Sequence, residues 1–304
     1  MIRVIDKDVL SSDKKHMLKG KLYLPEGKAK GFFHVVHGMT EYIGRYDYMM
    51  RRMAEAGYIT FGYDHLGHGH TAVTEKELGF IADKNGWERL IDDVFVYGNA
   101  IRKAMGEDLP FILMGHSMGS FIVRLAAVKY DHYDKLIVMG TGGPNPAAAA
   151  GIAVTCVLKK LKGGHGYSTL VYKMAFGSYN QRFADEHDPY AWLSVNKENR
   201  DLYRADKFCT FMFTVSAMQD LIRLNKGSNE KIWFDMIDKR KPILLISGSE
   251  DPVGEYGEGV TKVCDLLKSH GANVRMRLYD GYRHEILRDD CKDEVIEELL
   301  DFVG

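Results

Sequence analysis

The sequence predicts an α/β fold in which helices flank a mostly parallel β-sheet. Strand-like runs alternate with helix-length amphipathic stretches over residues 1–145, and the same alternation returns in residues 233–304. A serine between two glycines lies where one of these strands meets a helix. Between the two α/β parts, residues 146–232 contain only helical patterns and loops. We therefore expect one α/β core that carries a helical insertion.

The chain begins with two strand patterns. Residues 2–9 and 18–24 contain β-branched, aliphatic and aromatic residues between charged ones, and Pro25 ends the second pattern. Residues 31–36 form a continuous apolar run, which is typical of a strand buried on both faces, and the run stops at His37-Gly38. These patterns predict two peripheral strands followed by a central one.

Helices and strands then alternate. A helix is expected over residues 45–56, because Gly57 is typical of the position after a helix end. The strand pattern 58–63 is followed by a helix over 87–105, whose apolar residues recur at helical spacing. That stripe consists of Leu90, Val94, Tyr97 and Ile101. Next come a strand over 111–114, a helix over 121–130 and a strand over 135–139.

The insertion follows what is predicted to be the sixth strand of the sheet. After it, the sequence predicts a strand over 242–246, a helix over 255–269, a strand over 273–279 and a helix over 290–303. The simplest interpretation divides the chain into a core, 1–145 and 233–304, and a helical cap or lid over the active site, 146–232. The alternative is that the inserted helices only extend the core.

Composition excludes several classes of function. A formal net charge of −1 gives no basic surface for nucleic acid. The N-terminus is charged, and no apolar run approaches the roughly 20 residues that a membrane-spanning helix needs. We therefore expect a cytoplasmic protein. The scattered cysteines lack the spacing of a metal site. The histidines His65, His68 and His70 could bind a metal on an extended loop, but no carboxylate or cysteine completes such a site and the glycines between them indicate a turn, so no metal is expected.

Ser117 is the candidate nucleophile. The sequence Gly115-His116-Ser117-Met118-Gly119 joins an apolar strand to a helix. This arrangement is typical of the nucleophile elbow of α/β-hydrolases, in which a tight turn exposes the serine hydroxyl above the sheet. Glycines two positions to either side relieve the crowding that such a turn creates. The motif therefore predicts acyl-transfer chemistry.

An acid and a base are expected later in the chain, in the order serine, acid, histidine. Asp251 follows the strand after the insertion, and Pro252 stiffens its loop. We prefer it to Glu250, although an aspartate beside a proline can also serve only to cap a turn. His284 lies in the loop between the last strand and the last helix. His37 and His116 are interpreted as packing and loop-orienting residues.

The tetrahedral intermediate needs two backbone N–H donors, an oxyanion hole. One is expected from Met118, at the start of the helix after the nucleophile, where the helix dipole also favours negative charge. The other is expected from Met39, in the loop after the strand 31–36.

With these residues, the chain resembles the monoacylglycerol lipase and lysophospholipase branch of the α/β-hydrolases, which is grouped with serine aminopeptidase-like hydrolases. The resemblance rests on the elbow, on residues 37–41 with Arg45-Tyr46, on 63–70, on 247–251 and on His284-Glu285. It implies an eight-stranded sheet, a helical cap and hydrolysis of carboxylic esters without metal or organic cofactor. It also implies that Glu41 and Arg45 pair near the alcohol side of the site, or only as a structural ion pair. Gly38, Glu41, Arg45 and His116 are thus candidate substrate-binding residues.

We expect an esterase or lipase that acts on a single-chain acyl ester such as a monoacylglycerol, a lysophospholipid or a short-chain ester. The expected partner is this small molecule, with transient contact to a lipid surface through the cap, whose apolar residues pack on the core or line an acyl tunnel. Two alternatives remain. An aminopeptidase would need a carboxylate in the cap for the substrate ammonium, for which Asp185, Glu186 and Asp188 are candidates. A hydrolase fold that only binds a ligand would not need the nucleophile, acid and base. The sequence indicates no oligomeric state.

Overall fold

A computed structural model describes residues 2–106 and 108–304 of the chain. An eight-stranded sheet forms the centre, in the order β1-β4-β6-β5-β7-β8-β9-β10. The strands of this sheet are β1 Arg3–Asp6, β4 Gly20–Leu24, β5 Gly31–Val36, β6 Tyr58–Tyr63, β7 Phe111–His116, β8 Lys135–Met139, β9 Ile243–Gly248 and β10 Val274–Tyr279. β4 pairs antiparallel with both of its neighbours, β1 and β6, and the other pairs in the sheet are parallel. The predicted mostly parallel sheet is confirmed.

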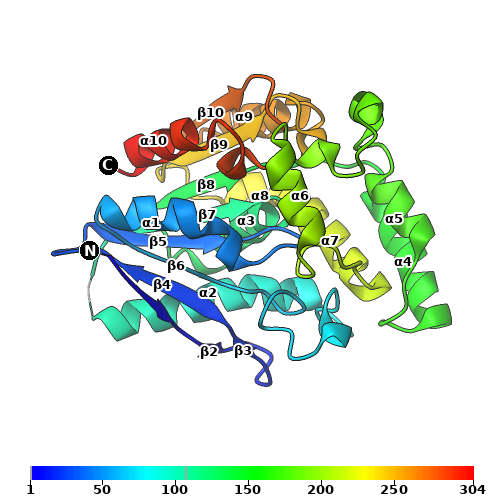
Figure 1. The fold of residues 1–304 in the computed structure, drawn as a ribbon, viewed down its shortest axis with the longest axis horizontal. Helices are drawn as coiled ribbons and strands as arrows, with labels where there is room; N and C mark the ends of the chain where they lie inside the picture. Colours follow the sequence, from blue (N-terminus) through cyan, green and yellow to red (C-terminus); the bar gives the residue numbers. More distant parts are fainter. Residues whose placement is uncertain (1, 107) are drawn as a thin grey trace.

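Helices cover both faces of this sheet (Figure 1). Helices α1 (Asp47–Glu55) and α10 (Lys292–Val303) pack into one apolar cluster on one face. Helices α2 (Gly86–Met105), α3 (Met118–Tyr130) and α9 (Glu258–Ser269) pack into a second cluster on the other. The central strands β5, β6 and β7 are buried on both faces, which explains their continuous apolar runs.

The two N-terminal strands are shorter than predicted, because the chain changes its pairing partner within each run. The run 2–9 is divided between β1 and β2 (Val9–Leu10), and the run 18–24 between β3 (Met17–Leu18) and β4. β2 and β3 form a separate two-stranded sheet. Between β3 and β4, the backbone of Lys19 bonds outside both sheets. Its N–H donates to Thr71 Oγ1 and its carbonyl accepts from Asp64 N.

Helix α9 begins three residues later than predicted. Glu255, Tyr256 and Gly257 have φ values of 52°, 59° and 89°. A right-handed helix cannot include these left-handed residues, so it starts only at Glu258. The preceding residues Pro252–Gly254 form the short 3₁₀ helix η5.

The segment between β8 and β9 is helical, as predicted for an insertion after the sixth strand. Its α-helices are α4 Ala148–Lys162, α5 Thr169–Phe176, α6 Lys197–Ala205, α7 Val215–Ser228 and α8 Lys231–Met236. Helices α4 and α5 lie at the edge of the molecule that is remote from both termini (Figure 1). By contrast, α7 packs against α2 and α3 of the core as well as against α4. The boundaries 146–232 stay a prediction, and α7 is the part of that range most closely joined to the core.

No helix in the described ranges 2–106 and 108–304 has both the length and the apolar character needed to cross a membrane. Within the same ranges, no group of three or more His, Cys, Asp or Glu residues is arranged to hold a metal ion. Cys156, Cys209, Cys264 and Cys291 are all free thiols.

His34 in β5 is an unusual core residue. Its ring is completely buried and stacks on Phe61 at a centroid distance of 4.6 Å. Neither ring nitrogen has a hydrogen-bond partner among the residues that the structure describes. Burial, with a smaller contribution from His132, holds the pKa of His34 well below its ordinary value. The folded protein therefore keeps this imidazole neutral under mildly acidic conditions.

The replacement His34→Leu is expected to make the protein less sensitive to acid. An unfolded histidine takes up a proton below about pH 6.5. Because the buried imidazole cannot follow, each such histidine lowers the free energy of unfolding by about 2 kcal/mol between pH 7 and pH 5. Urea unfolding at both pH values should show that this loss is about 2 kcal/mol smaller in the variant. Equal losses in the two proteins would contradict the prediction.

Candidate active site

Ser117 lies at a sharp turn between β7 and α3. Its backbone angles are φ 54° and ψ −121°, a conformation that is strained for a residue with a side chain. The Ser117 N–H donates to Met139 O at 2.9 Å, which fixes the turn against the next strand. A Cβ atom on Gly119 would collide with the backbone carbonyl of Val36. These features are those of the nucleophile elbow that the sequence predicts.

Asp251 and His284 are brought together from different loops. Asp251 follows β9 and His284 follows β10, and these parallel neighbours end at the same edge of the sheet. Asp251 Oδ2 lies 2.9 Å from His284 Nδ1 and accepts a hydrogen bond from Ser247 Oγ at 3.1 Å. The other carboxylate oxygen accepts from Val253 N at 2.9 Å. Asp251 thus caps the turn and also contacts the imidazole.

Glu250, the alternative acid, points elsewhere. Its carboxylate is partly exposed and lies 3.3 Å from Arg182 Nη1. Its side chain therefore makes no contact with His284 in the structure, and the geometry favours Asp251.

Ser117 and His284 line one cavity of about 710 Å³ between the sheet and the inserted helices. In the described residues the His284 ring bonds to Asp251 through Nδ1, and no hydrogen bond joins it to Ser117 Oγ. Met39 and Met118 line the same cavity. The first N–H groups of a helix have no intrahelical acceptor, so that of Met118 is available. Gly38 brings the Met39 loop close, since a Cβ on Gly38 would lie 2.9 Å from Ser117 Cβ.

A buried ionic network lies beside the elbow. His116 Nδ1 lies 3.0 Å from Glu41 Oε1, and His116 Nε2 lies 3.2 Å from the backbone carbonyl of His284. Arg45 Nη1 lies 3.4 Å from Glu41 Oε2, whereas its bonds to Glu285 measure 2.5 and 2.9 Å. Glu41 and Arg45 therefore pair as expected, but the main partner of Arg45 is Glu285.

The charges of this network stabilise one another. Burial opposes the ionisation of Glu41, but His116 and Arg45 outweigh it and hold the pKa of Glu41 below its ordinary value. Burial would likewise lower the pKa of His116, but the hydrogen bond and charge of Glu41 raise it above its ordinary value. A protonated His116 can donate from both ring nitrogens, to Glu41 and to the carbonyl of His284. The network thus supports the loop that carries His284.

The four candidate substrate-binding residues divide into two pairs. Glu41 and His116 line the cavity, whereas Gly38 and Arg45 are not among its lining residues. The Gly38 N–H donates to Glu41 Oε1 at 2.5 Å. The geometry therefore gives Gly38 and Arg45 positions behind the cavity wall, and a direct substrate contact by any of the four stays a prediction.

Sequence reasoning missed Trp192 and Arg283. Trp192 lines the cavity, and its ring centroid lies 5.2 Å from that of His284. Arg283 Nη1 donates to Ala191 O at 2.6 Å. Trp192 belongs to no motif. Tryptophan is rare in this chain, which has just three, and this rarity was the one feature of the sequence that could have drawn attention to it. Arg283 precedes the predicted base directly, but its partners are remote in the chain.

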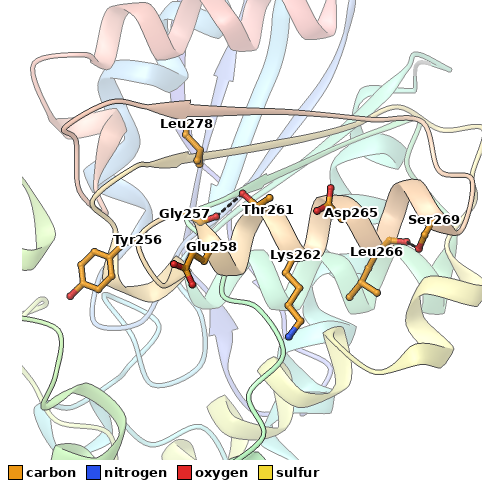
Figure 2. Close-up of a pocket in the computed structure, with 9 residues that line it drawn as sticks. All are labelled: Tyr256, Gly257, Glu258, Thr261, Lys262, Asp265, Leu266, Ser269 and Leu278. Atoms are coloured by element: carbon orange, nitrogen blue, oxygen red, sulfur yellow. Dashed lines mark hydrogen bonds between the residues drawn. The ribbon is translucent and has the colours of Figure 1, made fainter.

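A second depression lies on the surface, along α9 beside β10 (Figure 2). Its lining includes Glu258, Lys262 and Asp265, and Thr261 Oγ1 donates to the Gly257 carbonyl at 2.9 Å within the helix itself. It contains none of the predicted site residues. The cavity that holds Ser117 is therefore the candidate active site.

The comparison with known families agrees with this geometry. Residues 27–291 match the family described as serine aminopeptidase, S33. The chain belongs to this family. The predicted relation to monoacylglycerol lipase-like α/β-hydrolases is confirmed by the relatives and the solved structures that follow.

Named relatives of this family member are lipases. It is 25% identical over 296 residues to the monoglyceride lipase of Mus musculus, with 93% of this chain and 86% of that protein covered. It is 34% identical over 270 residues to the phospholipase YtpA of Bacillus subtilis (strain 168), with coverage of 88% and 93%. Among solved structures it is similar to a highly thermostable carboxyl esterase from Bacillus coagulans in complex with glycerol. That similarity has a TM-score of 0.92 and 30% identity, and covers 99% of this chain and 97% of the other.

Proposed function

We propose that this protein is a serine hydrolase that cleaves carboxylic esters of single-chain acyl substrates, such as monoacylglycerols, lysophospholipids or short-chain esters. The observation that carries the proposal is the contact between Asp251 and His284 in the loops around the cavity that contains Ser117. The names of its relatives, monoglyceride lipase, phospholipase and carboxyl esterase, support the same bond type.

In the proposed mechanism, Ser117 Oγ attacks the acyl carbon while His284 accepts its proton. Asp251 fixes the imidazole tautomer and stabilises the charge that the imidazole gains. The backbone N–H groups of Met39 and Met118 stabilise the oxyanion, and each such donor contributes about 10²–10³-fold to the rate. His284 then protonates the leaving alcohol, and a water activated by the same histidine hydrolyses the acyl-enzyme.

The composition of the cavity supports an acyl chain as the bound group. Apolar side chains from the inserted segment line it, among them Phe176 of α5, Ile222 of α7, and Phe211 and Met212 in the loop before α7. Apolar walls are typical of pockets for lipid-like ligands, although polar side chains such as Lys173 and Asn225 also line this cavity. Exposed apolar residues on the outer helices α4 and α5, with Leu161 at 75% and Met174 at 65% exposure, support a transient contact with a lipid surface.

The aminopeptidase alternative has less support. Glu186 is paired with Arg200 and Arg283, and Asp188 lies 2.6 Å from Arg204 Nη2. Arginines thus neutralise Glu186 and Asp188, and none of the three candidates Asp185, Glu186 and Asp188 lines the cavity. None of them is therefore placed to hold a substrate ammonium.

A substrate panel tests the proposal. Esters of graded acyl length, monoacylglycerols, lysophospholipids and aminoacyl arylamides should be compared, together with labelling by a fluorophosphonate and mapping of the labelled peptide. We expect ester cleavage and a label on Ser117. Arylamide cleavage without ester cleavage would favour the peptidase. No turnover and no label would favour a fold that only binds a ligand.

A further inference from the structure

A short segment of the helical insertion lies against the loop that carries His284. On one side, Arg283 Nη1 donates to Ala191 O at 2.6 Å. On the other, the Glu285 N–H donates to Leu193 O at 2.7 Å. Between these bonds, the Trp192 and His284 rings lie 5.2 Å apart between centroids, at an angle of 38°. Three consecutive residues of one segment thus contact three consecutive residues of the other.

This segment is itself held firmly on both sides. The backbone N–H of Trp192 donates to Asn180 Oδ1 at 2.9 Å. Beyond it, the buried carboxylate of Asp289 accepts from Ser194 Oγ at 2.9 Å and from Val195 N at 3.0 Å. Residues 191–195 are therefore joined to the loops around β10 by backbone and side-chain bonds. A segment fixed in this way holds its side chains, including the Trp192 indole, at a constant position against the imidazole.

One hydrogen bond alone does not fix an imidazole. Asp251 holds Nδ1 of His284, but a ring held at one atom can still tilt about that bond. Two neighbouring rings restrict such a tilt. One is that of His116, whose centroid lies 4.7 Å from that of His284, and the other is that of Trp192. The aromatic face of an indole also attracts a cation, so it favours the imidazolium that forms during catalysis.

We propose that Trp192 is a positioning residue, which holds the His284 imidazole in the orientation needed to take the proton from Ser117. The proposal rests on the hydrolase function proposed above. It gives the segment Ala191–Leu193 a part in the chemistry, in addition to a part in substrate binding.

Kinetics on a small ester separate positioning from binding. The acetyl group of p-nitrophenyl acetate is too short to fill the cavity. For Trp192→Leu we expect kcat on this ester to fall about 10–100-fold, because small errors in the geometry of a base are costly, while KM stays nearly constant. Trp192→Phe keeps a flat ring at this position and should restore most of kcat. Trp87→Leu is the matched control, because Trp87 is also half-buried but lies outside the cavity, and it should leave kcat unchanged.

Tryptophan fluorescence gives a readout that does not depend on turnover. Protonated imidazole quenches a neighbouring indole, so the emission of the wild type should fall as His284 takes up a proton. The charged or titratable groups that face this pair are Asp251, His116 with Glu41 behind it, and Tyr179, whose ring lies 5.1 Å from that of Trp192. The transition should therefore be lost in both His284→Asn and Trp192→Phe.

Three outcomes would overturn the proposal. One is a Trp192→Leu variant with unchanged kcat. Another is a variant in which only KM for long-chain esters rises, which would make Trp192 part of the acyl wall alone. The third is a fluorescence transition that persists in His284→Asn. If the wild type cleaves no ester but shows the transition, the proposed function fails and the catalytic role of Trp192 fails with it, while the contact between Trp192 and His284 is supported.

Discussion

The replacement Ser117→Ala is expected to reduce kcat for ester hydrolysis roughly a million-fold. The size of this decrease in kcat follows from the role of the Ser117 hydroxyl, because without it no acyl-enzyme can form and the base has no proton to accept. KM should change little, since the methyl group of alanine leaves the cavity lining intact. Initial rates with a monoacylglycerol and with p-nitrophenyl acetate measure the effect, with fluorophosphonate labelling as a second test.

The fold should survive this change. Among the residues that the structure describes, Ser117 Oγ makes no hydrogen bond that holds the elbow, and the backbone bond from Ser117 N to Met139 O is kept in the variant. Ser269→Ala, on α9 and outside the cavity, is the matched serine control and should behave as the wild type. A Ser117→Ala protein that folds and retains more than about 1% of wild-type activity would exclude this serine as the nucleophile.

The replacement Asp251→Asn is expected to reduce kcat by about 10⁴-fold. An asparagine can still accept the hydrogen bond from Val253 N with its carbonyl oxygen. Its amide NH₂ then faces His284 Nδ1 and donates to it, which places the proton of the imidazole on Nε2. That nitrogen can no longer accept a proton from Ser117. The measurement is kcat at saturating ester, with thermal unfolding as a test of the fold.

Glu250→Gln provides the control at the neighbouring position. Its side chain is partly exposed and pairs with Arg182, and exposed pairs contribute about 0–1 kcal/mol. Activity within about twofold of the wild type is therefore expected. If Glu250→Gln lost activity while Asp251→Asn kept it, the assignment of the acid would have to be reversed.

The sequence was informative where function depends on short local patterns. The elbow could be predicted because its glycines are required by the close approach of α3 to β5, which the position of Gly119 against Val36 illustrates. Asp251 and His284 could be predicted because each follows a strand, and the ends of neighbouring parallel strands meet. Such rules need only the order of elements along the chain.

Contacts between remote segments could not be predicted in the same way. Arg45 and Glu285 are separated by 240 positions, and nothing in the sequence around Arg45 distinguishes Glu285 from Glu41 as its main partner. The change of partner at Lys19 likewise depends on Thr71 and Asp64, which only the folded chain brings near. The contact of Trp192 with His284 depends on how the inserted helices pack. The spacing of apolar residues predicts that these helices exist, but not how they pack.

The bonds from Ala191 and Leu193 to the final loop also bear on protein engineering. Exchange of lids between hydrolases is an attractive route to new selectivity, and residues 146 and 232 would be the natural junctions for such chimaeras. A graft with those junctions would replace the acceptors on which Arg283 and Glu285 depend, and with them the support of the imidazole. A graft that ends before Asn180 would exchange α4 and α5 and leave that support in place.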